Sequence, residues 1–523
     1  MLVNIPAAKC IGINAIPINV EVDIVPGIGI HLVGLADTAV KESLLRTVTA
    51  LQALDYKIPG RKIVINLAPA DIHKSGSGFD LPIAIGILAA SGQCVFPSLS
   101  DFLIMGELGL DGSVRDIPGV LPFADMARQK AYTACIFPLH SSLEAADLEG
   151  IDIYGVRTLT DVVDILSGNA NANTFKVRNT LEWNRLRRAG QRQKALEKEA
   201  QGFMDFADII GQEGAKRGLE IAAAGMHNVI LLGSPGAGKS SLSKAMSAIL
   251  PPMTKEESIV VSKIYSVAGL GSGSPGLISV RPFRAPHYSA SLPAMIGGGS
   301  GDRIVPGEVT LAQSGVLFLD EFNLMSRSVI EALRAPLEDR KVLVSRLRNK
   351  IEYPASFMMI AAANPCPCGY YGEGDRCTCS PAQRMGYLSK LSGPILDRMD
   401  IQLWLHPVDP KTMLERKKGE SSAAVQERVL KARIAQKHRF AGDSIFTNAE
   451  MDNKQIEKYC PLSAECRTAL NKIMERLHLS MRAFHRIIKV ARTIADLEGA
   501  EEITSAHIVE AASYRFLDKQ NLY

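Results

Sequence analysis

The sequence lacks a long hydrophobic run, a secretory leader and any internal repeat. Its longest uninterrupted apolar run is Leu81 to Ala90, well short of the roughly 18 to 20 residues that cross a bilayer. The first residues, MLVNIPAAKC, have neither the basic start nor the apolar stretch of a signal peptide. No segment recurs at a solenoid period. With 46% hydrophobic and 22% charged residues, the composition predicts a globular cytoplasmic protein without a membrane partner.

The chain also lacks a paired set of cysteines and a strong net charge. Nine cysteines are an odd number, and a reducing cytosol argues against a disulfide framework, so a cysteine cluster is better interpreted as a metal site. The net charge of +4 is small, but residues 1–170 hold 11 Lys/Arg against 18 Asp/Glu, whereas residues 171–523 hold 48 against 37. A polyanion such as DNA should therefore meet the second part.

The 523 residues are enough for two to four domains. Residues 1–168 alternate strand-like and helical stretches and predict an α+β domain. Residues 169–202 comprise a small polar linker and a charged connecting helix, with a nucleic-acid contact as the alternative. Residues 203–408 form a second, α/β block. Residues 409–523 are helical without a clear strand.

The strongest motif is GSPGAGKS, which follows the apolar run NVILL and precedes the helical SLSKAMSAIL. The pattern GxxxxGK[ST] lets backbone N–H groups turn around phosphates, while Lys239 neutralises the β/γ charge and Ser240 binds Mg²⁺. We therefore predict a site for ATP and Mg²⁺. Its binding residues are Gly233, Ser234, Pro235, Gly236, Ala237, Gly238, Lys239, Ser240 and Ser241.

A second element, GVLFLDE, is an apolar strand that ends in Asp320 and Glu321. Asp320 would hold the Mg²⁺ and Glu321 would polarise the attacking water, so we predict an ATPase rather than a protein that only binds nucleotide. Two acidic residues at a strand end are common by chance, but not about eighty residues after a P-loop.

With these two motifs the chain resembles the AAA+ ATPases, and further motifs of that family follow in order: DIIGQEGAKRGLEIAAAG upstream, then FMMIAAANP, LSGPILDRMDI and SMRAFHRIIKVARTIADLEG. The resemblance implies adenine contacts, a polar sensor, an arginine finger and a second sensor, respectively at Ile209, Ile210 and Gly211, at Asn364, at Arg398 and at Arg482. A finger completes the ATP site of a neighbouring subunit, so it implies a homo-hexameric ring. The resemblance also makes residues 203–408 the ATPase domain and residues 409–523 its C-terminal helical lid. A turn residue, a local ion pair and a solvated basic face remain the alternatives for Asn364, Arg398 and Arg482.

Two insertions resemble those of magnesium-chelatase-like and MCM-helicase-like AAA+ proteins, where they point toward the ring channel. One is rich in Gly, Pro and basic residues and precedes GVLFLDE. The other is hairpin-like, with Val342 and Val344 alternating with Lys341 and Ser345. Packing at a subunit boundary is the alternative for the hairpin. The candidate contacts to a DNA backbone are Arg281, Arg284, Lys341, Arg346, Arg348 and Lys350.

The segment CPCGYYGEGDRCTC follows Asn364 directly and places Cys366, Cys368, Cys377 and Cys379 in the spacing C-x-C-x8-C-x-C. Four soft ligands with Gly and Pro in the turns suit a closed tetrahedral Zn²⁺ site that orders residues 364–380. A closed site leaves no open position, so the zinc would be structural. Free or redox-active thiols are the alternative.

Taken together, the N-terminal block, linker, P-loop, NPCPCG, SGPILDRMD and ARTIADLEG resemble the ComM/YifB family of magnesium-chelatase-like ATPases over essentially the whole chain. The resemblance implies a bacterial hexameric motor on single-stranded or branched DNA. It implies a helicase for branch migration during natural transformation, with recombination proteins among its partners. An ATP-driven chaperone that remodels a protein or metal-cofactor complex, as in magnesium chelatase, is the alternative.

The N-terminal block contains ADIHKSGSGFDLPIAIGIL and MGELGLDGSVRDIPGVLPFADMA, which resemble the Lon-protease-like domain. Proteolysis there needs a serine activated by a lysine. The resemblance puts Gly78 at the serine position, or Ser77 after a shift of one, and Phe123 at the lysine position, with no lysine after it until Lys130. We therefore expect a structural or docking domain without protease activity.

Overall fold

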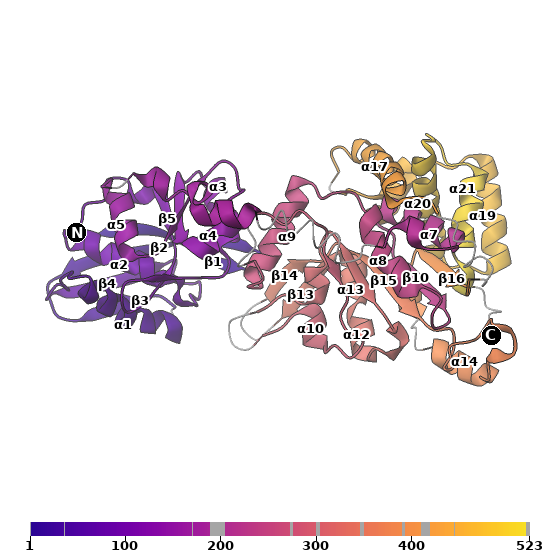
Figure 1. Ribbon diagram of the computed structural model, residues 1–523, viewed down its shortest axis with the longest axis horizontal. Coiled ribbons are helices and arrows are strands. Elements are labelled where there is room, and N and C mark those ends of the chain that lie inside the picture. Colours follow the sequence, from indigo (N-terminus) through magenta and orange to yellow (C-terminus); the bar gives the residue numbers. More distant parts are fainter. Residues whose placement is uncertain are drawn as a thin grey trace.

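The computed structural model describes residues 2–35, 37–169, 171–188, 204–271, 276–299, 304–345, 350–389, 393–408, 419–443 and 445–518. Two α/β bodies follow one another, and the C-terminal helices pack on the second (Figure 1). The mixed α/β class expected from the sequence is confirmed. The described part contains no helix that is both long and apolar enough to cross a membrane.

The first body begins with a four-stranded sheet in the order β1-β2-β4-β3. Its strands are β1 (Val3–Ile11), β2 (Asn14–Val25), β3 (Ile30–Val33) and β4 (Lys62–Ala68), with β3 parallel to β4 and the other pairs antiparallel. Helices α1 (Thr38–Ala53) and α2 (Asp80–Ala90) pack beside it. The longest apolar run of the sequence is α2, which is hydrophobic all round because it is buried on every side.

A second, parallel sheet completes the first body in the order β5-β8-β9. Its elements are β5 (Phe102–Ile104), β8 (Ala134–Pro138), β9 (Asp152–Val156), the small hairpin β6 (Glu107–Leu108) and β7 (Val114–Arg115), and helices α3 (Val120–Gln129), α4 (Leu139–Ser142) and α5 (Leu159–Ser167).

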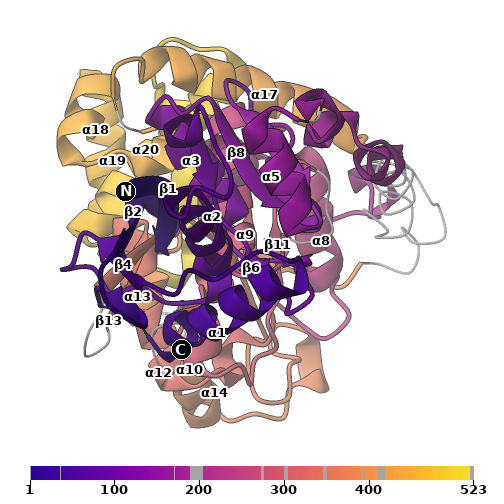
Figure 2. The same ribbon diagram turned by 90° about the vertical axis from the view of Figure 1, so that its left-hand side faces the viewer.

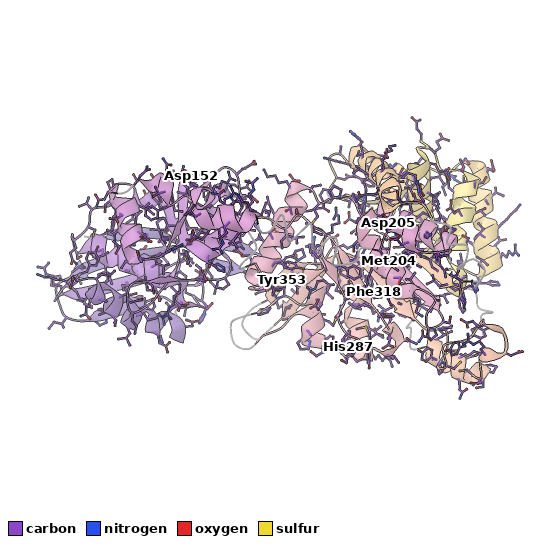
Figure 3. All side chains as sticks on the ribbon, in the orientation of Figure 1. Asp152, Met204, Asp205, His287, Phe318 and Tyr353 are labelled. Carbon is purple, nitrogen blue, oxygen red and sulfur yellow. The ribbon has the colours of Figure 1, made fainter. Side chains whose placement is uncertain are left out.

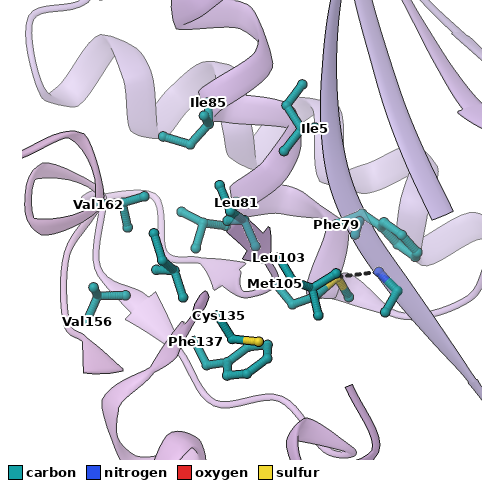
Figure 4. Close-up of a cluster of buried hydrophobic side chains, with 14 of the residues drawn as sticks. Ile5, Phe79, Leu81, Ile85, Leu103, Met105, Cys135, Phe137, Val156 and Val162 are labelled. Atoms are coloured by element: carbon teal, nitrogen blue, oxygen red, sulfur yellow. Dashed lines mark hydrogen bonds between the residues drawn. The ribbon is translucent and has the colours of Figure 1, made fainter. Parts of the chain in front are cut away.

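One hydrophobic core joins the two sheets of the first body. Leu81 and Ile85 of α2 lie over the side chains of the parallel sheet, and the Ala8 backbone N–H donates to Met105 Sδ at 3.3 Å (Figure 4). The core also contains Val177 and Trp183, which lie beyond the boundary expected at residue 168. Residues 181–188 are helical, and residues 189–202 of the expected charged helix and linker lie outside the described residues.

The second body is built on five parallel strands in the order β11-β12-β15-β10-β16. The strands are β10 (Val229–Gly233), β11 (Phe283–Arg284), β12 (Val316–Leu319), β15 (Met358–Ala363) and β16 (Ile401–Leu405). Strands β10, β12 and β15 are continuous apolar runs because helices cover both faces of the sheet. These helices include α7 (Glu213–Gly225), α8 (Lys239–Ile249), α10 (Leu292–Ile296), α11 (Glu308–Leu311) and α12 (Arg327–Ala332).

The two insertions of this body have different structures. The hairpin-like sequence forms antiparallel β13 (Lys341–Ser345) and β14 (Lys350–Pro354), as expected, with Val342 and Val344 buried. It follows α13 (Arg334–Asp339). The cysteine segment leads into α14 (Pro381–Leu388), and α15 (Gly393–Leu396) precedes β16.

The described C-terminal residues after β16 are helical, as the sequence predicts. The helices are α17 (Ser422–Arg439), α18 (Asn453–Tyr459), α19 (Ala464–Leu477), α20 (Met481–Glu498) and α21 (Ser505–Ser513). They gather on one side of the molecule, opposite α10, α12 and α14 (Figure 2). Their apolar faces share one hydrophobic cluster with α7, α8 and one face of the sheet.

Helix α9 (Lys255–Val267) lies where the two bodies meet (Figure 1). Lys263 forms an ion pair with Asp125 of α3, and both side chains are nearly buried. One turn further on, Ser266 Oγ donates to Glu144 Oε1 at 2.6 Å. Burial raises the pKa of Glu144, although this hydrogen bond opposes the shift. Buried, directional contacts of this kind set the orientation of the first body on the second.

Candidate active site

The predicted P-loop lies at the carboxyl end of β10, where a central strand of the parallel sheet ends. Gly236 and Gly238 have φ angles of +82° and +92°, in the left-handed region that favours glycine, and a Cβ at either position would meet no atom within 4 Å. The loop therefore turns tightly and stays open above its glycines before α8 begins at Lys239. Helix N-termini and inward-turned N–H groups bind phosphates, so this end of the sheet is suited to an anion.

Lys239 is held over the loop by three acceptors. Its Nζ donates to Gly233 O at 2.7 Å, to Ser234 O at 2.9 Å and to Asn364 Oδ1 at 3.0 Å. Burial lowers the pKa of Lys239, and the charge of Asp320 opposes that shift. The structure thus brings the predicted sensor Asn364, at the end of β15, into direct contact with the P-loop lysine.

The acidic pair lies beside the loop, at the carboxyl end of β12. Ser240 Oγ donates to Asp320 Oδ2 at 3.0 Å, so the two predicted Mg²⁺ ligands are already neighbours. Glu321 is exposed and has a φ of +48°, an uncommon conformation for a residue with a side chain. Strained residues of this type cluster at functional sites, and the turn presents the Glu321 carboxylate to solvent.

The upstream segment closes another side of the loop. Ile209 is buried, Ile210 is half-buried, and Gly211 packs against Val408. The next residue, Gln212, donates through Nε2 to Ala237 O of the P-loop at 3.3 Å and to His406 O at 2.6 Å. Sequence reasoning missed Gln212, because its partners lie 25 and 194 residues away.

The four cysteines converge as their spacing predicts. Their sulfur atoms all lie within 4.8 Å of one another, and Cys377 Sγ is 3.8 Å from Cys366 Sγ and 3.7 Å from Cys368 Sγ. Four sulfurs about 2.3 Å from a zinc ion form a tetrahedron with edges of about 3.8 Å, so the donor set fits Zn²⁺. A hydrogen bond from the backbone of Tyr370 lowers the pKa of Cys368 to about 6, which favours the thiolate that binds metal.

The predicted arginine finger, Arg398, and the predicted second sensor, Arg482, lie at the opposite, amino end of the sheet. Asn228, just before β10, donates its backbone N–H to Asp400 Oδ2 at 2.9 Å and its side-chain amide to Arg398 O at 3.4 Å. Five strand residues at about 3.3 Å each separate this end from the P-loop by about 16 Å. Arg398 and Arg482 are therefore not brought to the P-loop of their own chain.

Arg398 forms an ion pair with Glu338 of α13 and donates to Pro394 O at 2.7 Å, and its side chain is only 10% exposed. A local ion pair is thus present in this chain, with Glu338 rather than with a neighbouring aspartate. Arg482 is 63% exposed and lies 3.7 Å from Asp397. Arg486, one turn along α20, is paired with buried Asp400.

These basic residues surround a cavity of about 590 Å³. Arg340 and Lys489 also line it, and their hydrogen bonds go to the backbone carbonyls of Phe357 and Ala449 at 2.9 and 3.1 Å. Burial lowers the pKa of Lys489 to about 8, with Asp400 opposing the shift and Arg486 adding to it. A cavity with several closely spaced cations is suited to an anion.

The predicted DNA contacts differ in how fully their side chains are engaged by other residues of the chain. The contacts of Arg281 argue against its prediction as a DNA contact. Its five N–H donors bond the Glu257 carboxylate and the carbonyl oxygens of Ser314, Pro251 and Pro252, and its side chain is 10% exposed. It therefore holds the fold together and has no donor left for a phosphate.

Arg284 is also engaged, because it forms a two-pronged ion pair with Glu308 at 2.6 and 2.7 Å. Lys341 is exposed on the hairpin and lies 2.7 Å from Glu352, and Lys350 is exposed at the start of β14. Arg346 and Arg348 lie outside the described residues.

The two positions that align with the serine and lysine of a protease lie at a cavity of about 500 Å³ between the two bodies. Gly78 and Phe123 both line it, so the two aligned positions do converge. Tyr353 of β14 forms part of the opposite wall, at the junction of the bodies (Figure 3). Ser77 Oγ donates to Glu107, and Lys9, a cavity lysine that sequence reasoning missed, donates to His73 O.

Comparison with known proteins extends over nearly the whole chain. Residues 205–413 match the family model described as magnesium chelatase, subunit ChlI, residues 20–141 match subunit ChlI of Mg-chelatase, and residues 419–515 match the ChlI C-terminal model. Competence protein ComM of Haemophilus influenzae is 42% identical over 96% of this chain and 95% of its own length.

Two further relatives are similar to different extents. The uncharacterized protein YifB of Escherichia coli is 40% identical over 97% of this chain and 96% of its own length. The magnesium-chelatase 38 kDa subunit of Rhodobacter capsulatus is 28% identical, over 31% of this chain and 50% of that subunit. Similarity to the chelatase subunit is thus partial, whereas similarity to the first two is end to end.

Proposed function

The chain belongs to the ComM/YifB family of magnesium-chelatase-like AAA+ ATPases, and from this premise we propose that it is an ATP-driven, ring-forming DNA translocase. We propose a homo-hexamer that promotes branch migration when incoming DNA recombines during natural transformation. The ring is inferred from one observation: the candidate ATPase residues are divided between opposite ends of one sheet. The name of the Haemophilus relative supports the link to competence.

The carboxyl end supplies the residues that bind ATP. The P-loop N–H groups and Lys239 hold the phosphates, and Ser240 and Asp320 hold Mg²⁺, which neutralises the charge that develops on the phosphates. The exposed Glu321 orients the attacking water, and Asn364 fixes Lys239 and the water beside it. Ile209, Ile210 and Gly211 border the adenine.

The amino end supplies the cations for a neighbouring protomer. In a ring built from head-to-tail contacts, the cationic cavity of one protomer can face the P-loop of the next. Arg398 is then the finger and Arg482, the most exposed cation of the set, is the second sensor. Arg398 has to exchange Glu338 for the phosphate, because both need the same guanidinium.

We assign the four-cysteine cluster to a structural Zn²⁺ ion. Its sulfur distances match a tetrahedral site, and all four positions are filled by protein ligands. The ion would order a segment that has too few apolar residues to fold on its own. It takes no part in hydrolysis, because no coordination position remains for water or substrate.

For DNA, the hairpin lysines Lys341 and Lys350 remain the candidate contacts among the described residues, together with Arg346 and Arg348. The loss of Arg281 from this set, and the match to chelatase family models, support the second candidate function. That candidate is an ATP-driven chaperone that remodels a protein or metal-cofactor complex. The alternatives differ in whether DNA stimulates hydrolysis.

The experiment is steady-state ATP hydrolysis, alone and with single-stranded, duplex and forked DNA, at two salt concentrations. Stimulation that fades as salt rises supports the translocase. Hydrolysis that ignores every DNA supports the chaperone. As a check on the catalytic assignment, Glu321→Gln should bind ATP, form a stable ring and hydrolyse about 100-fold more slowly or worse. Normal turnover by that variant would refute the role of Glu321.

A further inference from the structure

The cysteine segment does not stand away from the nucleotide site; it touches it. Cys366 is completely buried and lies two residues after Asn364, whose side chain bonds the P-loop lysine. The first turn of the segment is closed by the Gly369 N–H, which donates to Cys366 O at 3.0 Å. This turn brings the backbone of Gly369 against the outside of the P-loop.

The contact at Gly369 is too close for any side chain. Its φ is +85°, and a Cβ there would lie 2.8 Å from Pro235 Cδ and 3.0 Å from Pro235 Cγ. The same Cβ would lie 4.0 Å from Asn364 Cγ. The turn between the cysteines therefore packs at once on the P-loop and on the residue that holds Lys239.

The other side of the segment is anchored to β16. A Cβ on Gly372 would lie 3.1 Å from the Trp404 ring, and Tyr371 packs edge-on against the same ring with 6.3 Å between centroids. Two residues after Trp404, the carbonyl of His406 accepts the Gln212 amide that also bonds Ala237 of the P-loop. The cysteine segment is thus clamped between β16 and the P-loop.

We propose that the four-cysteine segment is a wall of the nucleotide site, in which Gly369 is a positioning residue that supports Pro235 and the metal-bound cysteines hold Gly369 in place. This rests on the proposed ATPase and zinc assignments. Because Gly369 packs closely against Pro235, the P-loop keeps the backbone conformation in which its N–H groups turn inward. When the support loosens or shifts, phosphate binding weakens, although no cysteine contacts the nucleotide.

The chain offers a matched control in the same segment. Gly374 also has a left-handed backbone, with a φ of +60°, but a Cβ there meets no atom within 4 Å. Gly369→Ala and Gly374→Ala therefore carry the same kind of backbone penalty, and only the first presses on Pro235. The difference between the two variants isolates the contact.

The experiment measures the dissociation constant of a fluorescent ATP analogue, together with zinc content and thermal midpoint. Gly369→Ala should weaken binding about 10-fold while it keeps its zinc, and Gly374→Ala should stay within about 2-fold of the wild type. Pro235→Ala should restore part of the loss in the double variant, because it removes the atoms that the new methyl meets. Equal affinities for wild type and Gly369→Ala, or a loss that Pro235→Ala leaves untouched, would overturn the proposal.

Metal removal tests the second half. Zinc-stripped wild type should bind the analogue about as weakly as Gly369→Ala, and unchanged affinity in zinc-free protein would overturn the role of the metal. Lys239→Ala keeps this inference separate from the function. If the wild type binds no better than Lys239→Ala, the ATPase assignment fails, whereas normal wild-type binding with an indifferent Gly369→Ala defeats only the inference.

Discussion

The two ends of the five-stranded sheet carry different groups: the P-loop and the acidic pair lie at the carboxyl end, and a cluster of arginines lies at the amino end. At the carboxyl end, Lys239, Ser240, Asp320 and Asn364 already contact one another, and the loop above them is open. At the amino end, arginines line a cavity and are paired with acids of their own chain, as Arg398 is with Glu338. The first end thus has the loop, lysine and acidic residue of the proposed ATP site in place, and the second presents the cations of the proposed finger and second sensor.

The arginines at the amino end differ in how deeply they are buried and how closely they are paired. Burial alone would raise the pKa of Asp400, but Arg486 and His227 outweigh it and hold that pKa far below its usual range. Arg486 therefore favours the ionised form of Asp400, and the pair ties α20 to the start of β16. Arg482, which lies one turn earlier on α20, is 63% exposed. Neighbouring arginines on α20 thus differ: Arg486 is held in a buried ion pair, and Arg482 is exposed.

The largest expected effect comes from destroying one end at a time and mixing the products. Lys239→Ala should abolish ATP binding, and Arg398→Ala should bind ATP but lose about 1000-fold in hydrolysis rate. If the ends act across a subunit boundary, a mixture of the two inactive variants should regain activity. In an equal, random mixture, about a quarter of the interfaces pair an intact P-loop with an intact Arg398.

Recovery of hydrolysis in that mixture is measured against each variant alone at the same total concentration. The double variant, which carries Lys239→Ala and Arg398→Ala in the same chain, is the matched control and should stay inactive by itself. No recovery in the mixture of the two single variants would contradict the proposal that the amino end of one subunit serves the ATP of its neighbour.

Next in size is the loss of the cysteine cluster, which belongs to the carboxyl end. Cys366→Ser with Cys368→Ser should release zinc and lower the free energy of unfolding by a few kcal/mol, roughly 5 to 10 °C in Tm. Metal analysis and thermal unfolding measure both. Cys94→Ser, at a half-buried cysteine outside the cluster, is the control and should keep its zinc. Full zinc content in the double variant would end the metal assignment.

A smaller effect should separate structural from functional arginines. Arg281→Ala removes five hydrogen bonds, including an ion pair to Glu257, and should cost about 2 kcal/mol of unfolding free energy. DNA affinity and hydrolysis per folded molecule should not change. Arg327→Ala, at an exposed arginine of α12, is the matched control for stability. Weaker DNA binding by Arg281→Ala alone would contradict its structural assignment.

The smallest effect is expected on the hairpin, away from both ends. Lys350→Gln should weaken DNA binding about 2-fold and reduce the slope of log affinity against log salt by about 1, with basal hydrolysis unchanged. Lys341→Gln should do less, because Glu352 already neutralises that lysine. The salt slopes come from titrations of labelled DNA. Identical slopes for all three proteins would remove the hairpin from the DNA interface.

Where a motif is contiguous, its local geometry could be predicted from the sequence. The P-loop glycines, Lys239, the acidic pair and the cysteine spacing each lie within one short segment, and the local backbone converges as their patterns predict. Where the partner of a side chain is distant in the sequence, that partner could not be predicted. The acids that engage Arg281 and Arg398 lie 24 and 60 residues away, and Trp183 joins a core that composition placed behind a linker.

The sequence by itself determined which chemical groups converge locally, because glycines before a lysine, carboxylates after an apolar strand and four close cysteines are arranged by short-range geometry. Only the tertiary structure decided where that chemistry is delivered. It put Arg398 and Arg482 at the amino end of the sheet, the length of strand β10 away from the end that holds the P-loop, since residues before and after a parallel strand lie at opposite ends of it. It also put Gly369 against Pro235, a contact that depends on close packing between segments far apart in the chain.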